Sequence, residues 1–511
     1  MTTFFQHNSQ IFRRCRRAFG LIVSMLWFCC QSSFSQSIGD YGSNASGNWS
    51  TTGNWVICVA DGTWAGATPA VAVPGAGNNV WIRAGNTITV NASYSCNNLV
   101  TEHTAILITI EHTFTVNGTF INAGTFQDNN SSGTNYFYGK VNNEVTGLWD
   151  TRSADNSSDL QFGNGLEQKN TTANSFQIGG ARFTTNSQTI EGAGPISFSN
   201  SCRIGTTGIT VTNNNTGVIT LNDIFDGSTS VTATWINGSN STIVYNSNAE
   251  PFSNAGMVLD LSSNENTFIY DYAGDQNIKD IDYYHLEFSG SGIKTLTNNL
   301  TVKGDLTVSD GVTLNSDNYD INLSGDWNNN SITDGFTQAN SNVVYNGTTA
   351  QFISCAVAVG ETLYDVSISN TAGVSLSCDL TVEGTLTLNA NCCINLAGHT
   401  LNANSISETS PPEAKCKNFT AVLDGSGNVT ISAGDVDNGS TVDCGSPILS
   451  LSESAFDCDD VGDQTVKLYV TDIYGVKDSC EATVTVSDDD LPVPVCAVSG
   501  NQAVNTNNAC T

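Results

Sequence analysis

The sequence predicts an all-β chain in which a capped β-solenoid, similar to a β-helix, is followed by a β-sandwich. Three observations support this fold class. Gly (47), Asn, Ser and Thr are abundant while Met (3) is scarce, which favours short strands and turns over long amphipathic helices. Short segments with alternating apolar and polar residues recur along the chain, and helical periodicity is not convincing anywhere. An internal repeat then indicates how these strands stack.

Composition also limits the function. A chain of 511 residues has room for about two to four domains. Its 17 basic residues against 48 acidic ones give a formal net charge of −31, which excludes a nucleic-acid partner. Charged residues make up only 13% of the chain, too few for a disordered acidic protein. We therefore expect a folded, strongly acidic protein.

Residues 1–35 have the features of a signal peptide. Four arginines precede an apolar run at 18–30, and small residues at Ser33 and Ser35 suit cleavage after Ser35. The run is shorter than the ~20 residues of a membrane-spanning helix, so we expect no transmembrane segment in the mature chain. A twin-arginine signal at Arg16-Arg17 and lipidation at Cys29 are less favoured alternatives. The expected location is extracellular or on the outer cell surface.

Export has a consequence for the cysteines. Three of the 16 leave with the signal peptide, and the odd number that remains enters an oxidising compartment, where all but one can pair. The sequence contains no Cys-x-x-Cys pair and only five histidines, so zinc-ligand spacing is absent. Disulfides are therefore expected instead of a zinc site.

Residues 36–135 are predicted to form an N-terminal cap and the first solenoid coils. The segment is irregular and rich in Gly and Trp, and Cys58 and Cys96 could form a bridge within it. Exposed tryptophans could also stack on sugar rings, but large aromatics more often close the end of a β core, and we favour that role. The tryptophans concerned are Trp49, Trp55, Trp64 and Trp81.

Residues 136–407 are predicted to form the solenoid proper. Residues 284–308 align without a gap on 364–388, an offset of 80, with the Leu-Thr-Val run at 300–302 matching the run at 380–382. Outward positions change freely, as when Lys303 becomes Glu383. A packing repeat permits such changes and a repeated catalytic site would not. Stacked rungs of this kind bury a continuous core, which is typical of a β-solenoid.

The repeat pattern resembles the rungs of parallel β-helix regions in large secreted bacterial surface proteins. The resemblance covers residues 37–407 and implies an extracellular, bacterial protein. An array of β-sandwiches is the alternative arrangement of the same strands.

The character of the chain changes near Ser410-Pro411-Pro412, where cysteines become evenly spread and acids cluster. Residues 411–490 contain about seven short alternating strands, which is typical of a β-sandwich. Four cysteines in this segment allow three disulfide pairings, and spacing alone leaves all three open. They are Cys416, Cys444, Cys458 and Cys480.

This segment resembles a hyalin-type (HYR-like) repeat over residues 413–490, including the Thr-Asp-x-x-Gly turn at 471–475. The family is known for an immunoglobulin-like β-sandwich used in tandem in extracellular adhesive proteins. The resemblance implies the disulfides Cys416–Cys480 and Cys444–Cys458. Val476 departs from the Asn that commonly follows the turn glycine. Residues 491–511 resemble the start of a second, truncated repeat.

Two acidic clusters in this region supply the oxygen ligands that calcium prefers. Calcium between tandem repeats would stiffen the array and is the one cofactor the sequence suggests. A solvated acidic loop explains the same residues without a ligand, and we prefer that interpretation because no ligand spacing is diagnostic. The candidate calcium ligands are Asp457, Asp459, Asp460, Asp488, Asp489 and Asp490.

A second cluster could act on sugars. Asp280 and Asp282, expected on one strand face, lie among the tyrosines of residues 270–284, and paired carboxylates are what glycoside hydrolysis requires. Carboxylates on an exposed strand are more often ordinary surface. Glu102-His103 and Glu111-His112 could meet as a metal site, but polar surface pairs are the favoured explanation.

The sequence therefore favours a non-catalytic adhesin or extracellular structural protein that contacts glycans or surface and matrix proteins. The alternative is a β-helix carbohydrate-active enzyme with its site near Asp280 and Asp282. A third interpretation is a spacer that holds another domain away from the cell surface. No catalytic residue is expected under the favoured interpretation.

Overall fold

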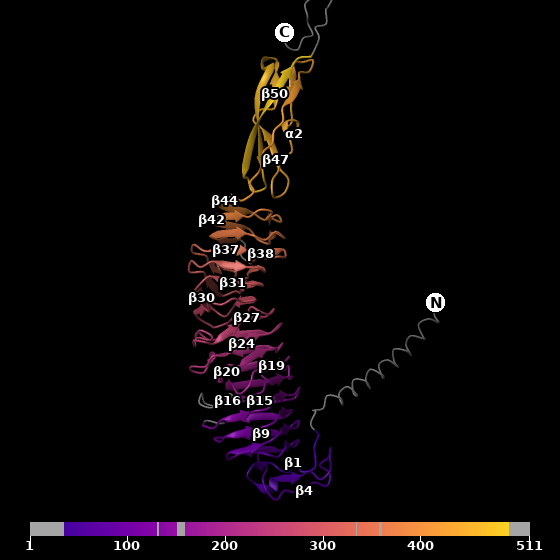
Figure 1. The fold of residues 1–511 in the computed structure, drawn as a ribbon, viewed down its shortest axis with the longest axis vertical. Coiled ribbons are helices and arrows are strands. Elements are labelled where there is room, and N and C mark those ends of the chain that lie inside the picture. Colours follow the sequence, from indigo (N-terminus) through magenta and orange to yellow (C-terminus); the bar gives the residue numbers. More distant parts are fainter. Residues whose placement is uncertain (1–34, 130–131, 151–158, 334, 357–359, 490–511) are drawn as a thin grey trace, which may run out of the picture. The chain divides into compact units, whose positions relative to one another are not determined.

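The structure is a computed structural model that describes residues 35–129, 132–150, 159–333, 335–356 and 360–489. The predicted signal peptide, apart from Ser35, and the predicted second repeat lie outside the described residues. The fold is all-β, with 2% helix. It contains a β-solenoid of about 15 turns, so the solenoid prediction is confirmed (Figure 1). The chain divides into two compact units, residues 1–263 and 264–511.

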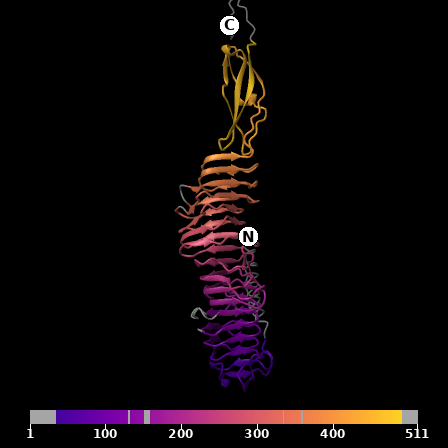
Figure 2. The same ribbon diagram turned by 60° about the vertical axis from the view of Figure 1, so that its left-hand side comes forward.

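In the first unit, most coils contribute one short strand to each of three faces. The strands pair in parallel with those of the next coil, and Figure 2 shows the resulting stack. One face is a 12-stranded sheet in which only the β1–β3 and β3–β4 pairs are antiparallel. In spatial order its strands are β26 (Val258–Asp260), β24 (Thr234–Asn237), β21 (Thr210–Asn213), β19 (Gln188–Gly192), β17 (Leu166–Gln168), β14 (Val141–Asn143), β11 (Phe120–Asn122), β8 (Leu99–Thr101), β5 (Val80–Ile82), β1 (Tyr41–Ser43), β3 (Trp55–Ile57) and β4 (Thr68–Pro69).

The other two faces of this unit are joined where the long strands β18 and β20 run from one face onto the next. Their strands are β2 (Gly47–Asn48), β6 (Thr87–Val90), β7 (Tyr94–Cys96), β9 (Ile106–Thr109), β10 (Phe114–Val116), β12 (Thr125–Asp128), β13 (Asn135–Phe137), β15 (Leu148–Asp150), β16 (Asp159–Phe162), β18 (Phe176–Phe183), β20 (Ile196–Ile204), β22 (Val218–Leu221), β23 (Ile224–Gly227) and β25 (Thr242–Tyr245). A single turn of 3-10 helix, η1 (Thr52–Asn54), precedes β3.

A buried polar ladder helps to keep the coils of the first unit in register. The Asn122 side chain donates to Asn143 (2.7 Å), 21 residues on, and Asn143 donates to Gln168 (2.7 Å), 25 residues further. All three side chains are fully buried. Because each amide satisfies the next, coils of different length still stack with the same residues opposite one another.

The N-terminal segment buries three of its four tryptophans, Trp49, Trp55 and Trp81, and leaves Trp64 half-buried. The Trp49 and Trp55 side chains are buried with ring centroids 4.9 Å apart, so neither presents a face for sugar stacking. The proposed bridge between Cys58 and Cys96 is wrong, because both are free buried thiols. Cys392 is also a free thiol, so the expectation that all but one cysteine would pair is wrong as well.

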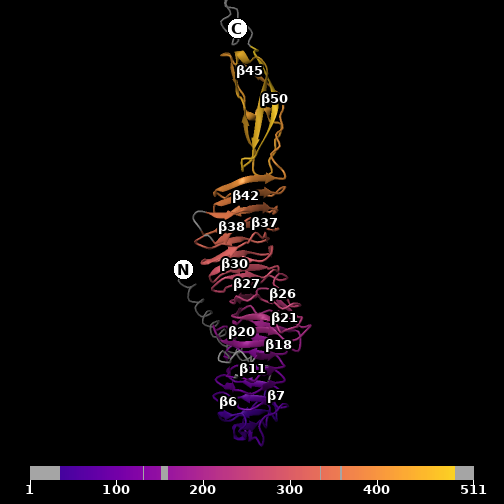
Figure 3. The ribbon, with the colours of Figure 1, turned by 90° about the vertical axis from the view of Figure 1, so that its left-hand side faces the viewer.

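The second unit is also built from short strands that pair in parallel with those of the next coil, here in three columns (Figure 3). The first column is β27 (Thr267–Tyr270), β29 (His285–Phe288), β32 (Leu306–Val308), β35 (Trp327–Asn329), β38 (Gln351–Cys355), β41 (Val374–Leu376) and β43 (Ile394–Asn395). The second is β28 (Gln276–Ile278), β30 (Gly292–Leu296), β33 (Val312–Asn315) and β36 (Phe336–Thr337). The third sheet contains β31 (Leu300–Val302), β34 (Ile321–Leu323), β37 (Asn342–Tyr345), β40 (Asp365–Ile368), β42 (Leu380–Leu388), β39 (Glu361–Leu363) and β44 (Leu401–Glu408).

The two copies of the 80-residue repeat have similar strand pairing, but corresponding strands can lie on different faces of the solenoid. Leu300 pairs with Ile321 and, one repeat later, Leu380 pairs with Leu401. However, β29 lies in the column of β32 and β35, whereas its counterpart β40 lies in the sheet of β34 and β37. The repeat is therefore not a whole number of coils, and it conserves inward packing without conserving any one outer surface.

The C-terminal module has a four-stranded sheet and a two-stranded sheet around one apolar core that includes Val436, Phe456 and Leu468. The larger sheet contains β45 (Phe419–Val422), β50 (Lys477–Ser487), β49 (Gly462–Thr471) and β47 (Ile448–Leu451); the smaller contains β46 (Asn428–Thr430) and β48 (Ala455–Asp457). Two short helical turns, α2 (Ala433–Val436) and η2 (Cys458–Asp460), connect strands.

Disulfides in this unit follow the expected pattern only in part. Cys416 is bonded to Cys480 (S–S 1.99 Å), the pairing that the resemblance implied. The implied Cys444–Cys458 bond is wrong, because Cys444 is bonded to Cys393 in the last solenoid coils. Cys458 is disulfide-bonded elsewhere. A third bond joins Cys355 to Cys378.

Candidate functional site

The fold separates the residues of the predicted sugar-binding cluster at 270–284. Tyr270 and Tyr283 are fully buried, and their hydroxyls bond to each other at 2.8 Å. Asp280 and Asp282 are exposed in the turn after β28, so the prediction that they share one strand face is wrong. The Asp280 carboxylate accepts a hydrogen bond from Asn298 (2.9 Å). The cluster therefore divides into core aromatics and separate surface acids.

Lys294, a buried lysine beside this turn, is bound by backbone carbonyls. The Lys294 ammonium donates to the carbonyls of Tyr272 (2.6 Å), Gly274 (2.9 Å) and Ser291 (3.0 Å). Burial lowers the pKa of Lys294 to about 8, and the nearby charges of Asp271 and Asp275 oppose that change. The ammonium holds two coils together by binding their carbonyls.

The candidate calcium ligands of the 457–460 loop bind their own backbone. The Asp457 carboxylate accepts from the Asp459 amide (2.8 Å), and the Asp460 carboxylate accepts from the Asp457 amide (2.9 Å), which caps η2 at its N-terminus. Asp488 and Asp489 follow β50, and Asp490 lies outside the described residues. Over the described parts of the chain, no three His, Cys, Asp or Glu side chains are arranged to hold a metal ion.

The two Glu-His pairs occupy different corners of one coil. Glu102-His103 lies in the turn between β8 and β9, and Glu111-His112 lies in the turn between β9 and β10. The Glu102 carboxylate accepts from the Ala84 amide (3.0 Å), an intercoil turn contact. The two pairs therefore do not meet across adjacent strands, and the prediction that they could is wrong.

The structure instead points to the joint between the last solenoid coils and the C-terminal module. We define the joint by three contacts. The disulfide Cys393–Cys444 links residues separated by 51 positions. The Asp443 carboxylate accepts from the Asn391 amide (2.7 Å). The Tyr474 hydroxyl contacts the backbone of Ile394.

Tyr474 acts at the joint as a substitute for a neighbouring strand. Its hydroxyl accepts from the Ile394 amide (2.7 Å) and donates to the Ile394 carbonyl (3.0 Å), so it satisfies both groups of an edge residue of β43. Burial raises the pKa of Tyr474 to about 12, which keeps this hydroxyl protonated and able to donate.

The Thr-Asp-x-x-Gly turn at 471–475 positions Tyr474 so that its side chain reaches the joint. Asp472 is buried, and its carboxylate accepts from the amides of Tyr474 (2.9 Å) and Val476 (2.9 Å). Gly475 has a φ of +89°, a conformation that favours glycine. The motif that the sequence singled out is therefore the support of Tyr474, although its role was not visible from the sequence.

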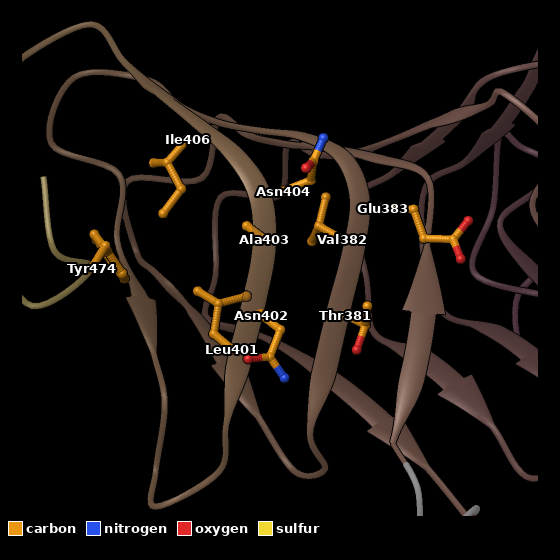
Figure 4. A pocket seen from close by; sticks show the side chains of 9 residues that line it. All are labelled: Thr381, Val382, Glu383, Leu401, Asn402, Ala403, Asn404, Ile406 and Tyr474. Atoms are coloured by element: carbon orange, nitrogen blue, oxygen red, sulfur yellow. The ribbon is translucent and has the colours of Figure 1, made fainter.

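A groove of about 420 Å³ opens beside Tyr474 at the end of the solenoid (Figure 4). Strands β42 and β44 form its wall. Among the described strands, β44 pairs only with β42. The side chains that line the groove are Thr381, Val382, Glu383, Leu401, Asn402, Ala403, Asn404, Ile406 and Tyr474.

Three carboxylates gather at the joint. Burial, a hydrogen bond with Asp472 and the charges of Asp472 and Asp443 raise the pKa of Glu408 to about 7. At neutral pH Glu408 is therefore held near the midpoint between its neutral and charged forms. The chemistry that this arrangement of carboxylates supports is proton binding.

Three residues of the joint, Cys393, Glu408 and Tyr474, were not predicted from the sequence. Adjacent Cys392 and Cys393, placed just before the predicted domain boundary, were a signal that one of them could cross it. Comparison of the chain with protein-family models, curated proteins and solved structures gave no match. In the described residues, no helix is both long and apolar enough to span a membrane.

Proposed function

We propose that this protein is a non-catalytic extracellular structural and adhesive protein, in which the solenoid carries the C-terminal module and contacts glycans or surface proteins. The observation that carries the proposal is the joint. A disulfide and the hydrogen bonds of the half-buried Tyr474 hydroxyl fix the module to the last coils, which is useful where a binding partner pulls on the chain. A flexible linker would serve an enzyme with an accessory module equally well.

The C-terminal module is proposed to be an immunoglobulin-like sandwich of the hyalin type. Support comes from its two sheets around one core and from the Cys416–Cys480 bond. Export through the N-terminal signal, and a bacterial cell surface as the destination, remain part of the proposal. Disulfide bonds support the export step because they persist in oxidising compartments.

The experiment measures adhesion and turnover on the same sample. Residues 36–511 are coupled to beads, and retention under flow is measured on surfaces coated with polysaccharides or matrix proteins, while released sugars are quantified. Retention without sugar release supports the proposal. Sugar release that disappears in the Asp280→Ala/Asp282→Ala variant, with folding intact, would establish the enzyme instead.

A further inference from the structure

The last solenoid coil ends in a strand with one unpaired edge. β44 pairs in parallel with β42, from Leu401 opposite Leu380 to Glu408 opposite Leu388. Among the described strands, β44 has no partner on its other side. We call this other side of residues 401–408 the open edge. Because β42 lies between the open edge and β39, the edge belongs to the final coil alone.

The inward side chains of β44 are covered less completely than those of the coil before. The inward residues of β42 are buried, because β44 lies over them. The residues in register with them on β44 are only half-buried, since no further coil covers them. We call three of these residues the inner row: Leu401, Ala403 and Ile406.

The C-terminal module covers other parts of the same coil. Tyr474 satisfies the backbone of Ile394 in β43, and Glu408, the next inward residue of β44, shares a hydrogen bond with Asp472. The inner row instead lines the groove of about 420 Å³ beside Tyr474 (Figure 4). One strand edge of the coil therefore has apolar side chains and backbone groups that the described part of the module leaves accessible.

An extended strand is the ligand that such an edge fits best. Its amides and carbonyls can pair with the backbone of the open edge, and its alternate side chains point to one face. Those side chains would enter the groove and cover the inner row, as each coil covers the one before it. Unpaired strand edges attract other strands for this reason.

The charge around the open edge favours a basic strand. Glu383 lies among the side chains that line the groove, none of which is cationic. Glu408 adds a second carboxylate at the end of β44. A lysine or arginine on an incoming strand would therefore meet carboxylates and no competing cation of the groove.

A second copy of this chain fits the open edge poorly. Each copy has a formal net charge of −31, so two copies repel each other. If two β44 strands paired antiparallel about the centre of residues 401–408, Leu401 of one copy would lie opposite Glu408 of the other. An apolar side chain beside a carboxylate gives a weaker pair than two apolar ones. We therefore favour a different protein as the partner.

The chain itself contains a strand sequence of the required kind. Residues 300–308 read Leu-Thr-Val-Lys-Gly-Asp-Leu-Thr-Val and align on β42 in the 80-residue repeat, with Lys303 in place of Glu383. The four inward residues of this segment, the leucines and valines, are buried. A basic strand with this alternation is thus compatible with the coil geometry of the solenoid.

We propose that the open edge of β44 binds an extended, basic segment of another protein as an added strand, with alternate apolar side chains over the inner row and a lysine or arginine beside Glu383. Main-chain hydrogen bonds supply affinity in this mode of binding, and the alternate side chains supply specificity. The inference rests on the proposed function, since it names one surface of the adhesive protein and the class of protein partner that the surface takes.

The test uses residues 36–511 and a fluorescent peptide with blocked ends. The peptide has the sequence of residues 300–308 with Asp305→Lys, so that it carries two lysines. A first control peptide has the same composition with all apolar residues in one block. Two further peptides are methylated at every second backbone nitrogen, one in each phase. Binding is measured by fluorescence anisotropy at two salt concentrations.

We expect one methylated peptide to lose binding and the other to keep it, because successive amides of a strand point to opposite edges and only one edge meets β44. The block peptide should bind about tenfold or more weakly than the alternating one, since it cannot place apolar side chains along the inner row. Both comparisons use the wild-type protein, so they remain valid if a protein variant fails to fold.

Protein variants locate the site. Ile406→Asn, within the inner row, should weaken peptide binding about tenfold or more, whereas Ser407→Asn, the adjacent exposed residue of the same strand, should stay within about twofold. Glu383→Gln should weaken binding several-fold and reduce its salt dependence. Circular dichroism and thermal unfolding confirm that each variant is folded.

Equal binding of the alternating and block peptides would show simple attraction between opposite charges and overturn the inference, as would an absence of peptide binding. Two other occupants of the edge are tested directly. A wild type that sediments as a dimer, which Ile406→Asn makes monomeric, would show that a second copy takes the edge. Peptide binding that becomes about tenfold tighter when residues 490–511 are removed would assign the edge to this chain's own segment.

The proposed function and the inference can fail separately. If the wild type adheres to coated surfaces and binds no peptide, the inference is wrong and the proposed function stands. If it binds the peptide as expected but adheres to none of the surfaces, the strand site stands and the adhesive function is wrong.

Discussion

The hydroxyl of Tyr474 accepts a hydrogen bond from the amide of Ile394 and donates one to the carbonyl of the same residue. One side chain of the C-terminal module therefore satisfies the backbone of an edge strand in the solenoid. Solenoid ends expose unpaired strand edges, which attract other strands. Here the module closes part of that edge and is held to it by the Cys393–Cys444 bond.

Tyr474→Phe is expected to destabilise the joint by about 1–2 kcal/mol, because the amide and carbonyl of Ile394 lose their partner in a partly buried place. Hydrogen exchange at the Ile394 amide should become faster while exchange in the module core is unchanged. Tyr469→Phe on β49 is the matched control. Unchanged protection of Ile394 would contradict the assigned role of the hydroxyl.

Cys444→Ser is expected to lower the unfolding free energy of the C-terminal module by about 2–4 kcal/mol. The bond closes a 51-residue separation, and the loop-entropy model gives about 4 kcal/mol for a loop of this size. Chemical denaturation followed by a signal from the module measures the change. Cys392→Ser, next to the bond but free, should have a smaller effect, and an equal effect would argue against the cross-link.

Stability of the joint is expected to fall as the pH rises from about 4.5 to 7. The folded-state pKa of Glu408 is about 7 against an ordinary value of 4.5, so in this window the folded protein keeps a proton that the unfolded chain has released. Because the folded state binds more protons than the unfolded chain in this window, the free energy of unfolding falls as the pH rises, until the pH passes the folded-state pKa.

Glu408→Gln removes this dependence. The variant should match the wild type at pH 4 and exceed it by about 1 kcal/mol at pH 8, once solvent screening of a partly exposed group is allowed for. Thermal unfolding at both pH values makes the comparison, with Glu413→Gln as the surface control. A variant that is less stable than the wild type at pH 8 would show that the Glu408 charge is not repelled at the joint.

The buried amide ladder makes a separate prediction for the first unit. Asn143→Ala removes the group between Asn122 and Gln168 and should cost about 2–4 kcal/mol, because it leaves buried polar atoms without partners and opens a small cavity. Asn142→Ala changes the adjacent, outward residue, whose Oδ1 has no hydrogen-bond partner among the described residues, and should cost under about 1 kcal/mol. Calorimetry of both variants tests the difference, and similar losses would contradict the ladder.

The solenoid was predictable because its signal is local. Alternation within short strands and the 80-residue repeat both follow from which side of a strand is buried, as in the Leu300–Ile321 and Leu380–Leu401 pairs. What the sequence could not show is which outer residues become neighbours. Arg182 and Arg203 meet only because the intervening coil has a particular length, and coil lengths vary along the chain.

The joint was missed for a related reason. Cys444 and Cys458 lie close in the sequence and fit the resemblance to a hyalin-type repeat, whereas the actual partner, Cys393, was assigned to the solenoid. A pairing across a predicted domain boundary leaves no periodic signal. The Thr-Asp-x-x-Gly turn was recognised, but its effect on Tyr474 depends on where the solenoid ends.

The joint carries the proposed function, and its disulfide can be measured directly. The mature protein is digested without reduction, with free thiols blocked, and the cross-linked peptides are identified by mass spectrometry. The expected result is one cross-linked pair that joins Cys393 to Cys444 and another that joins Cys416 to Cys480. A peptide that joins Cys444 to Cys458, with Cys393 recovered as a blocked thiol, would contradict it.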